Sequence, residues 1–294
     1  MSTKHKYDFA VTLRVTNANP NGDPLNGNRP RTNYENIGEI SDVCIKRKIR
    51  NRLMTMGESI LIQSDDNRTD ECTSIKSRID ASGLKTENKD FKKTACQKWF
   101  DVRAFGQVFA FAKGKGSSSG VSIPVRGPVS IQHAFSLEPV TITSTQITKS
   151  TNAEDKKKKG SDENAMSSDR MGMKHRVDHG VYVFYGSINS QLASDETGTG
   201  FSDDDADKLK EALRTLFEDD ASSARPDGSM EVLEVIWWKH KNASGDLSSA
   251  KVHGSVRDNV NPLTGEIIDS KKLSLSFQED EKELSLNPEI IPGF

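Results

Sequence analysis

A dense group of basic side chains is the feature of this sequence with the clearest chemistry. Five of them fall within seven consecutive positions: Lys46, Arg47, Lys48, Arg50 and Arg52. At about 100° per residue, a helix stacks Lys46 and Arg50 one turn apart and places Arg47 beside them. A solvated helix face normally mixes charges of both signs, whereas residues 43–55 contain no acid. The group therefore favours contact with the phosphates of a nucleic acid over an idle solvated face.

A helix has to position this group, and the flanking residues predict one. Ser41 and Asp42 supply an N-cap and a first-turn carboxylate. Apolar residues then recur at helical spacing at Ile45, Ile49 and Leu53. Because these apolar residues would hold the helix to the core, we expect Lys46, Arg47 and Arg50 to point away from it.

A loop rich in Asn, Gly and Pro precedes the helix, over residues 17–30. Such residues cap their own backbone or accept left-handed conformations, which predicts an ordered loop. Arg29 and Arg31 stand at its end, and their planar guanidinium groups match phosphate oxygens. Arg126 before Gly127 is a weaker candidate, because a glycine there fits a strand bulge as well as a ligand. The alternative for all three arginines is a structural turn whose side chains point to water.

Signatures of enzymes and metal sites are largely missing. Residues 114–120, GKGSSSG, lack the full Walker spacing of a phosphate-binding P-loop. The three cysteines, Cys44, Cys72 and Cys96, lack C-x-x-C pairing, so we interpret them as buried or idle thiols. We therefore expect no catalytic residue, no metal and no cofactor.

Periodicity predicts four strands and two helices. Strands are expected at residues 7–16, 129–135, 181–188 and 230–238, and helices at 42–53 and 203–217. Their order is strand, helix, strand, strand, helix, strand, which is the split βαβ arrangement of α+β, ferredoxin-like (RRM-like) folds. Many unrelated proteins share this arrangement, so it does not by itself determine the function.

The last predicted strand contains two adjacent tryptophans. Trp237 and Trp238 must face opposite sides of a sheet, because side chains alternate along a strand. We expect one indole to belong to the core. An exposed indole favours a partner, so we expect the other to stack on a base or to fill a subunit interface.

The composition narrows the class of protein. The 294 residues carry 41 Lys+Arg against 43 Asp+Glu, a net charge of −2, so nucleic-acid affinity has to come from local clustering. Hydrophobic residues at 33% and charged residues at 29% predict one core with long polar arms. No run approaches the roughly 20 apolar residues of a membrane span, and no secretion signal follows Met1. We expect a soluble, cytoplasmic protein without membrane contact.

Five motifs follow one another in the order found in a known family. They are NANPNGDPLNGNRPR, SDVCIKRKIRN, FDVRAFGQV, VRGPVSIQHAFS and HGVYVFYGSIN. In this order they resemble the backbone subunit of type I-C CRISPR RNA-guided surveillance complexes (Cascade), the Cas-seven family of the RAMP superfamily. The resemblance extends from the first predicted strand to about Trp238.

The resemblance implies a hand-shaped subunit. A ferredoxin-like palm would comprise residues 1–56, 99–137 and 180–240. A finger-like insertion at 57–98 and a thumb insertion at 138–179 would interrupt it, and residues 241–294 would form a C-terminal extension. The polar, weakly periodic composition of both insertions agrees with this division. The charged run 154–164 lies in the implied thumb.

The resemblance also implies partners. Copies of the chain would stack as a helical filament along a CRISPR RNA guide (crRNA), which pairs with target DNA in antiviral defence. Other Cascade subunits would cap the ends of the guide and form the large subunit. Contact with the ribose-phosphate backbone of the guide would fall to Arg29, Arg31, Lys46, Arg47 and Arg50, with Arg126 as the weaker candidate.

The implied thumb would displace a base of the guide held by a neighbouring copy. Three methionines are candidates for that wedge: Met166, Met171 and Met173. Flexible apolar side chains can slip between bases. Packing within the thumb explains these methionines equally well.

Two other functions stay open at this point. Related backbone subunits of type III complexes cleave target RNA with an aspartate on a loop, as the superfamily resemblance implies. Asp23 and Asp42 are the nearest acids here, but turn formation and helix capping account for them. An RNA-binding monomer would instead read bases with aromatic residues on its sheet, for which the candidates are Phe9, Tyr182 and Phe184.

Overall fold

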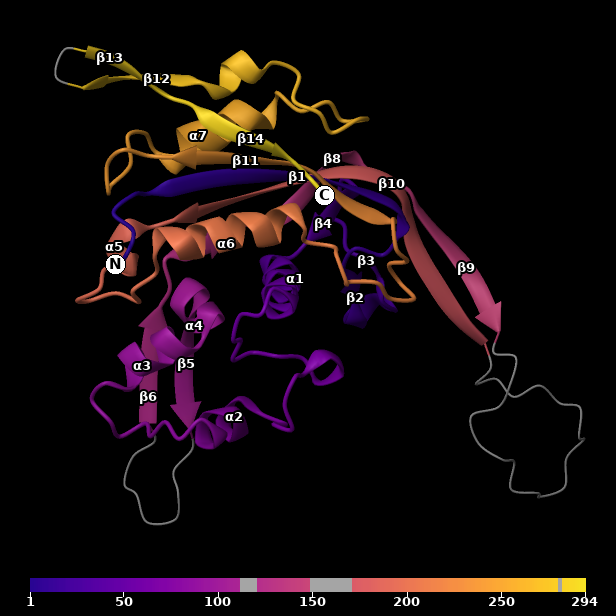
Figure 1. Cartoon of the computed structure of the whole chain (residues 1–294). Helices are drawn as coiled ribbons and strands as arrows, with labels where there is room; N and C mark the ends of the chain where they lie inside the picture. The colour runs from indigo at the N-terminus through magenta and orange to yellow at the C-terminus, as the bar shows by residue number, and fades with distance from the viewer. Residues whose placement is uncertain (112–120, 149–170, 280–281) are drawn as a thin grey trace, which may run out of the picture.

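The computed structural model describes residues 1–111, 121–148, 171–279 and 282–294, and a large antiparallel sheet lies at its centre (Figure 1). The strand order is β14-β11-β1-β10-β8-β4, and β7 and β9 pair with other parts of β10. The strands are β1 (Tyr7–Ala18), β4 (Ile37–Ile40), β7 (Val129–Ile131), β8 (Ala134–Pro139), β9 (Ile142–Thr148), β10 (Met171–Ile188), β11 (Met230–Lys239) and β14 (Pro288–Pro292). The two longest strands, β1 and β10, are neighbours in the middle of the sheet.

One face of the sheet is covered by α1 (Asp42–Thr55) and α6 (Asp203–Arg214), drawn below it in Figure 1. Apolar residues of both helices are buried in this core: Ile45, Ile49, Leu53, Leu209 and Leu213. On the sheet, Trp237 stacks on Phe9 with ring centroids 5.2 Å apart. Gly186 pairs with Phe9 across the strands, and a Cβ there would collide with the Phe9 ring, so this register requires glycine.

The opposite face is covered by the C-terminal segment, through α7 (Ser249–Arg257) and the short 3-10 helix η4 (Ser270–Leu273). Trp238 is buried there, and its Nε1 donates a hydrogen bond to Leu273 O at 3.0 Å. The two tryptophans therefore face opposite sides of the sheet, as predicted. The expectation that one indole is exposed to a base or a partner is wrong, because the chain after β11 returns to cover it.

Polar positions of β1 are buried on that second face as well. Asp8 and Thr12 alternate with apolar residues, which predicted one solvated face, yet both are fully buried. Asp8 Oδ2 accepts a hydrogen bond from His240 Nε2 at 2.8 Å and lies 3.2 Å from Lys6 Nζ. Asp8 Oδ1 lies 3.6 Å from His253 Nε2 on α7. Charged as well as apolar contacts hold the C-terminal segment on the sheet.

Residues 57–126, in the part that the structure describes, form a smaller unit beneath α1 and α6 (Figure 1). Its elements are η2 (Asp65–Asn67), α2 (Ile75–Ala81), α3 (Phe91–Lys98), α4 (Phe100–Phe105), β5 (Gly106–Phe111) and β6 (Val121–Arg126). A buried cluster joins Leu61, Ile79 and Phe91 to Trp99 and Phe109. The polar segment 57–98 thus contributes a core of its own, and the expected boundary between residues 98 and 99 passes through that core.

A two-stranded ribbon projects from the sheet, where β9 pairs with the first part of β10, Met171 to Val177 (Figure 1). It lies within the expected thumb. The remaining short elements are β2 (Gly22–Asp23), η1 (Pro24–Asn26), β3 (Arg29–Pro30), α5 (Ser190–Ala193), β12 (Leu275–Glu279) and β13 (Lys282–Leu286). Three features singled out in the sequence lie outside the described residues: the GKGSSSG segment at 114–120, the charged run 154–164 and Met166.

The structure confirms a mixed α and β fold with a large antiparallel sheet. All four predicted strands and both predicted helices are present, although residues 129–135 divide into β7 and β8 and the strand at 181–188 is the end of the longer β10. In the described part of the chain, no helix is long and apolar enough to cross a membrane.

Candidate nucleic-acid interface

The loop before α1 and the start of α1 are joined by side-chain hydrogen bonds. Asn21 Oδ1 accepts hydrogen bonds from Ser41 N and Ser41 Oγ, both at 2.9 Å. Ser41 Oγ in turn accepts one from Cys44 N at 3.3 Å and caps the helix. Within the loop, Asn19 Nδ2 donates to Asn28 O at 2.7 Å. These asparagines hold the loop in one arrangement against the helix that carries the basic group.

Arg50 does not point away from the core. It is 9% exposed, its Nε donates to Asp101 Oδ2 at 3.0 Å, and its guanidinium lies 5.1 Å from the centre of the Phe105 ring. Asp101 is fully buried and also accepts hydrogen bonds from the backbone of Leu61 and Ile62. The expectation that Arg50 points away from the core is wrong, because a carboxylate on α4 pairs with it inside the protein.

Two further cations of α1 are also neutralised within the chain. Lys48 is buried and forms an ion pair with Asp220, which Arg225 approaches at 3.3 Å. Arg52 lies 3.4 Å from the carboxylate of Asp219. Residues 43–55 contain no acid, but the segment after α6 supplies acids to the helix from outside. A one-signed run in the sequence therefore becomes a mixed-sign surface in the fold.

Arg47 is the cation of α1 that keeps no carboxylate partner. Its Nη1 donates to Ile62 O at 2.7 Å, and no described carboxylate forms an ion pair with it. Burial and the nearby charge of Arg50 lower the pKa of the Arg47 guanidinium. Its side chain lines a cleft of about 410 Å³ between α1, residues 64–67 and residues 219–225. Asp66 and Asp101 act on Arg47 only from a distance, so an anion in this cleft would supply the direct ion pair that Arg47 lacks.

The rest of the cleft suits a ligand with several oxygen atoms. Four cations line the cleft or pair with its acids: Arg47, Lys48, Arg52 and Arg225. Three carboxylates line it: Asp66, Asp219 and Asp220. The cations therefore exceed the carboxylates by one formal positive charge. Ser64, Asn67 and Ser222 add hydroxyl and amide groups. Asn51 Oδ1 is buried with no hydrogen-bond partner among the described residues, so it requires a donor.

Lys46 lies at the surface, at the other end of the basic group. Its Nζ pairs with Asp42 Oδ2 at 2.9 Å, and Asp42 Oδ1 lies 3.1 Å from His133 Nε2. The Lys46 side chain is 25% exposed. Exposed ion pairs one helical turn apart contribute only about 0.3–0.5 kcal/mol, so an incoming phosphate can replace Asp42 as the partner of Lys46.

The three predicted arginines outside α1 have different surroundings. Arg29 Nη1 donates to Ser144 Oγ at 2.9 Å, which ties the loop to the ribbon. Arg31 Nη2 lies 3.5 Å from Asp23 Oδ1, at the surface. Arg126 is exposed at the end of β6 and forms no ion pair with a described residue. The structure therefore does not gather all six predicted side chains into one site.

The ribbon exposes two of the three predicted methionines. Met171 and Met173 are two residues apart on β10, so they lie on the same face, and each is 54% exposed. Gln146 Nε2 donates to Met171 Sδ at 3.3 Å. The described residues thus leave both side chains open to a partner.

The residues considered for other functions have structural roles. Asp23 accepts a hydrogen bond from Leu25 N and caps η1, and Asp42 pairs with Lys46 and His133. The aromatic candidates for base stacking on the sheet are all fully buried: Phe9, Tyr182 and Phe184. The sheet therefore offers none of these rings to a base.

The thiols and potential metal ligands show no reactive arrangement in the described ranges. Burial raises the pKa of the Cys44 thiol, and it raises the pKa of Cys96 to about 11. Cys72 is half-buried, and all three thiols are free. No group of three or more His, Cys, Asp or Glu side chains is placed to hold a metal ion among the residues described.

Asn51 and Arg225 are cleft residues that sequence reasoning missed. Asn51 stands one helical turn after Arg47, so the periodicity of the basic group could have found it. Arg225 follows an irregular segment far along the chain from α1. No local pattern connects these two segments, because α6 brings them together only in the folded protein.

The chain matches the family model for CRISPR-associated protein Cas7 over residues 5–281. A curated relative, the CRISPR-associated protein Cas7 of Haloferax volcanii, is 28% identical over 117 residues, which cover 38% of this chain and 34% of the relative. The match thus spans about a third of that relative's length.

Two solved structures are also similar to this chain. One is a chain titled CRISPR RNA-guided surveillance complex, pre-nicking, with a TM-score of 0.47 and 15% identity, covering 79% of this chain and 78% of that one. The other is titled CRISPR RNA-guided surveillance complex, with a TM-score of 0.48 and 14% identity, covering 91% of this chain and 80% of that one.

Proposed function

This chain belongs to the CRISPR-associated protein Cas7 family, and we propose that it is a backbone subunit of an RNA-guided surveillance complex of the type I-C Cascade kind. The observation that carries the proposal is the family match, which covers residues 5–281. In this role the protein binds and orders a crRNA and performs no chemical step. Its partners would be the crRNA, further copies of itself, the end-capping and large subunits, and target DNA through pairing with the guide. It would act in the cytoplasm.

The domain plan of this proposal is a ferredoxin-like palm with a finger, a thumb and a C-terminal extension. The strand order β11-β1-β10-β8 supports the palm, because it corresponds to the order 4-1-3-2 of a split βαβ sheet, with α1 and α6 on one face. The unit around residues 57–126 supports a finger, and the ribbon of β9 and β10 supports a thumb.

The guide backbone would follow the cleft beside α1. We place one phosphate near Arg47, which has no carboxylate partner, and near Arg225 on the opposite wall. A ribose 2′-hydroxyl would supply the donor that Asn51 Oδ1 requires, which would favour RNA over DNA. Lys46, Arg29 and Arg31 would continue this path at the surface, with Arg126 as a weaker contact, and Arg50 is left out because it is buried.

The thumb would act on a neighbouring copy. Met171 and Met173 are exposed on one face of the ribbon and are candidates for a wedge between bases. Met166, outside the described residues, stays a third candidate. Sequence selection would come from pairing between guide and target, while the protein contacts backbone and shape.

Purification from cells that contain a guide locus tests this function. We expect the protein to carry nucleic acid and to elute far above 32.5 kDa, and negative-stain images to show curved, regularly segmented particles. A monomer free of nucleic acid at low salt, from cells shown to produce the guide, would contradict the proposal.

A further inference from the structure

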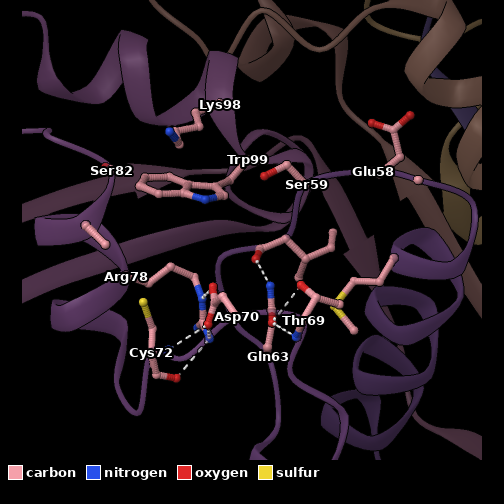
Figure 2. A pocket seen from close by; sticks show the side chains of 14 residues that line it. Glu58, Ser59, Gln63, Thr69, Asp70, Cys72, Arg78, Ser82, Lys98 and Trp99 are labelled. Atoms are coloured by element: carbon pink, nitrogen blue, oxygen red, sulfur yellow. Dashed lines mark hydrogen bonds and ion pairs between the residues drawn. The ribbon is translucent and has the colours of Figure 1, made fainter.

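A second cavity, of about 440 Å³, lies in the smaller unit and shares no lining residue with the α1 cleft. Figure 2 shows it between Trp99 and Lys98 on one side and Arg78, Asp70 and Gln63 on the other. Its walls come from the end of α1, the segment after it, α2 and the end of α3. The proposed contact with the guide backbone makes no use of this cavity.

The wall of the cavity contains an indole donor that has no acceptor among the described residues. Trp99 is 2% exposed, and no described residue accepts a hydrogen bond from its Nε1. Figure 2 shows the indole nitrogen on the side of the ring that faces Asp70 and Gln63 across the cavity. The indole of Trp238, by contrast, already donates to Leu273 O at 3.0 Å. The cavity therefore offers a donor that a ligand can use.

The acids of the cavity are already neutralised, and its side-chain donors Gln63, Arg78 and Ser82 are engaged within the chain, whereas its lysine has no such partner among the described residues. Asp70 accepts two hydrogen bonds from Arg78, at 2.6 and 2.8 Å, and Glu58 pairs with Lys208 at 2.6 Å. Hydrogen bonding to Arg78 lowers the pKa of Asp70 to about 2. Lys98 has no carboxylate partner among the described residues, and its Nζ lies 5.9 Å from the centre of the Trp99 ring. A ligand here has to bring acceptors and negative charge.

The size and the apolar part of the lining restrict the ligand further. The volume is more than ten times the roughly 30 Å³ that a water molecule occupies, so a simple anion would leave it mostly empty. Met54, Ile60 and Ala81 line it beside the polar groups. The geometry points to a site for one nucleotide, with its phosphate near Lys98 and an acceptor atom of its base or sugar on Trp99 Nε1. The nucleotide could be free or part of a strand.

Calorimetric titration of the full chain with AMP, adenosine and a short single-stranded oligouridylate tests this site. We expect AMP to bind more tightly than adenosine. Trp99→Phe keeps a ring but removes the donor, and should weaken AMP about threefold to tenfold, the usual effect of one hydrogen bond. Trp237→Phe is the matched control, because it removes an indole N–H of a buried tryptophan that does not line the cavity. It should leave AMP binding unchanged.

A second variant keeps the test valid if Trp99→Phe does not fold. Lys98→Ala should weaken AMP and leave adenosine unchanged, whereas Lys92→Ala, at an exposed position of the same helix, should alter neither. If only the oligonucleotide depends on Trp99 and Lys98, the nucleotide belongs to a strand, and if AMP does too, the site also accepts free nucleotides.

The site and the proposed function fail in different ways. Absence of AMP and oligonucleotide binding at the cavity, or equal losses in the test and control variants, would overturn the nucleotide site. Loss of AMP binding in Arg47→Ala but not in Lys98→Ala would also overturn it, because the nucleotide would then lie in the α1 cleft. None of these results would affect the association of the chain with a guide.

Discussion

The two faces of the central sheet are held by different kinds of contact. On the α1 face, buried ion pairs such as that of Arg50 with Asp101 stand beside an open cleft, where Arg47 forms no ion pair with a described carboxylate. On the α7 face, Asp8, His240 and His253 form a buried network among themselves. A basic side chain therefore indicates a binding surface only where no carboxylate of the folded chain already pairs with it.

The largest effect should come from breaking the network on the α7 face. Asp8→Ala removes the acceptor of the hydrogen bond from His240 and the partner of Lys6. Removing one member of a buried charge pair costs about 3–5 kcal/mol, so we expect the free energy of unfolding in urea to fall by about that amount. Asp207→Ala, at an exposed aspartate of α6, is the control. A loss below about 1 kcal/mol in Asp8→Ala would refute the structural importance of this network.

Arg50→Ala should have the next largest effect, on stability and not on binding. It leaves the fully buried Asp101 with its two backbone donors but without its cation. We expect a loss of about 3 kcal/mol in urea denaturation, at the lower end for a buried pair. RNA affinity per folded molecule should be unchanged. A stable variant that binds RNA more weakly would show instead that Arg50 reaches phosphates.

The stability of the α7 face should also depend on pH. Burial lowers the pKa of His253 below its ordinary value of 6.5, so the unfolded chain takes up this proton first as the pH falls. Burial opposes ionisation of Asp8, but hydrogen bonds from His240 and Ser249 and the charges of Lys6 and His253 together outweigh it and lower the pKa of Asp8 below 3.8. Both shifts make the protein less stable at lower pH, from His253 below about pH 6.5 and from Asp8 below about pH 4.

Urea denaturation at pH values from roughly 4.5 to 7.5 covers the titration of His253 and stays above that of Asp8. It therefore separates the effect of His253 on the free energy of unfolding from the effect of Asp8. His253→Gln should flatten the loss of stability on acidification. An unchanged pH dependence would show that His253 is not responsible for it.

Much of the fold could be predicted from the sequence, because its core strands and helices have clear periodicity. The strand predicted at β1 and the spacing of Ile45, Ile49 and Leu53 are local signals that the structure confirms, although the predicted solvated face of β1 is buried. The covering of Trp238 could not be predicted in this way, since it depends on a return of the chain after β11. The basic group shows the same limit: its acids, Asp101 and Asp220, lie far away in the sequence.

Lys46→Ala should have the smallest effect on stability. Its ion pair with Asp42 joins two side chains one helical turn apart at the surface. We therefore expect the free energy of unfolding to change by at most about 0.5 kcal/mol in thermal or urea denaturation. A larger loss would mean that the contact of Asp42 with His133 depends on Lys46, and His133→Ala would then reproduce the loss.

The most direct test of the cleft is the salt dependence of RNA binding by wild-type protein, Arg47→Ala and Arg257→Ala, with a guide RNA and a scrambled RNA. Arg257 is exposed on α7, on the other face of the sheet, and is the matched control. If Arg47 neutralises one phosphate, its loss should weaken both RNAs alike and flatten the slope of log affinity against log salt by about 0.7. Arg257→Ala should keep the wild-type slope. Equal slopes for Arg47→Ala and wild type would contradict the contact between Arg47 and a phosphate of the guide.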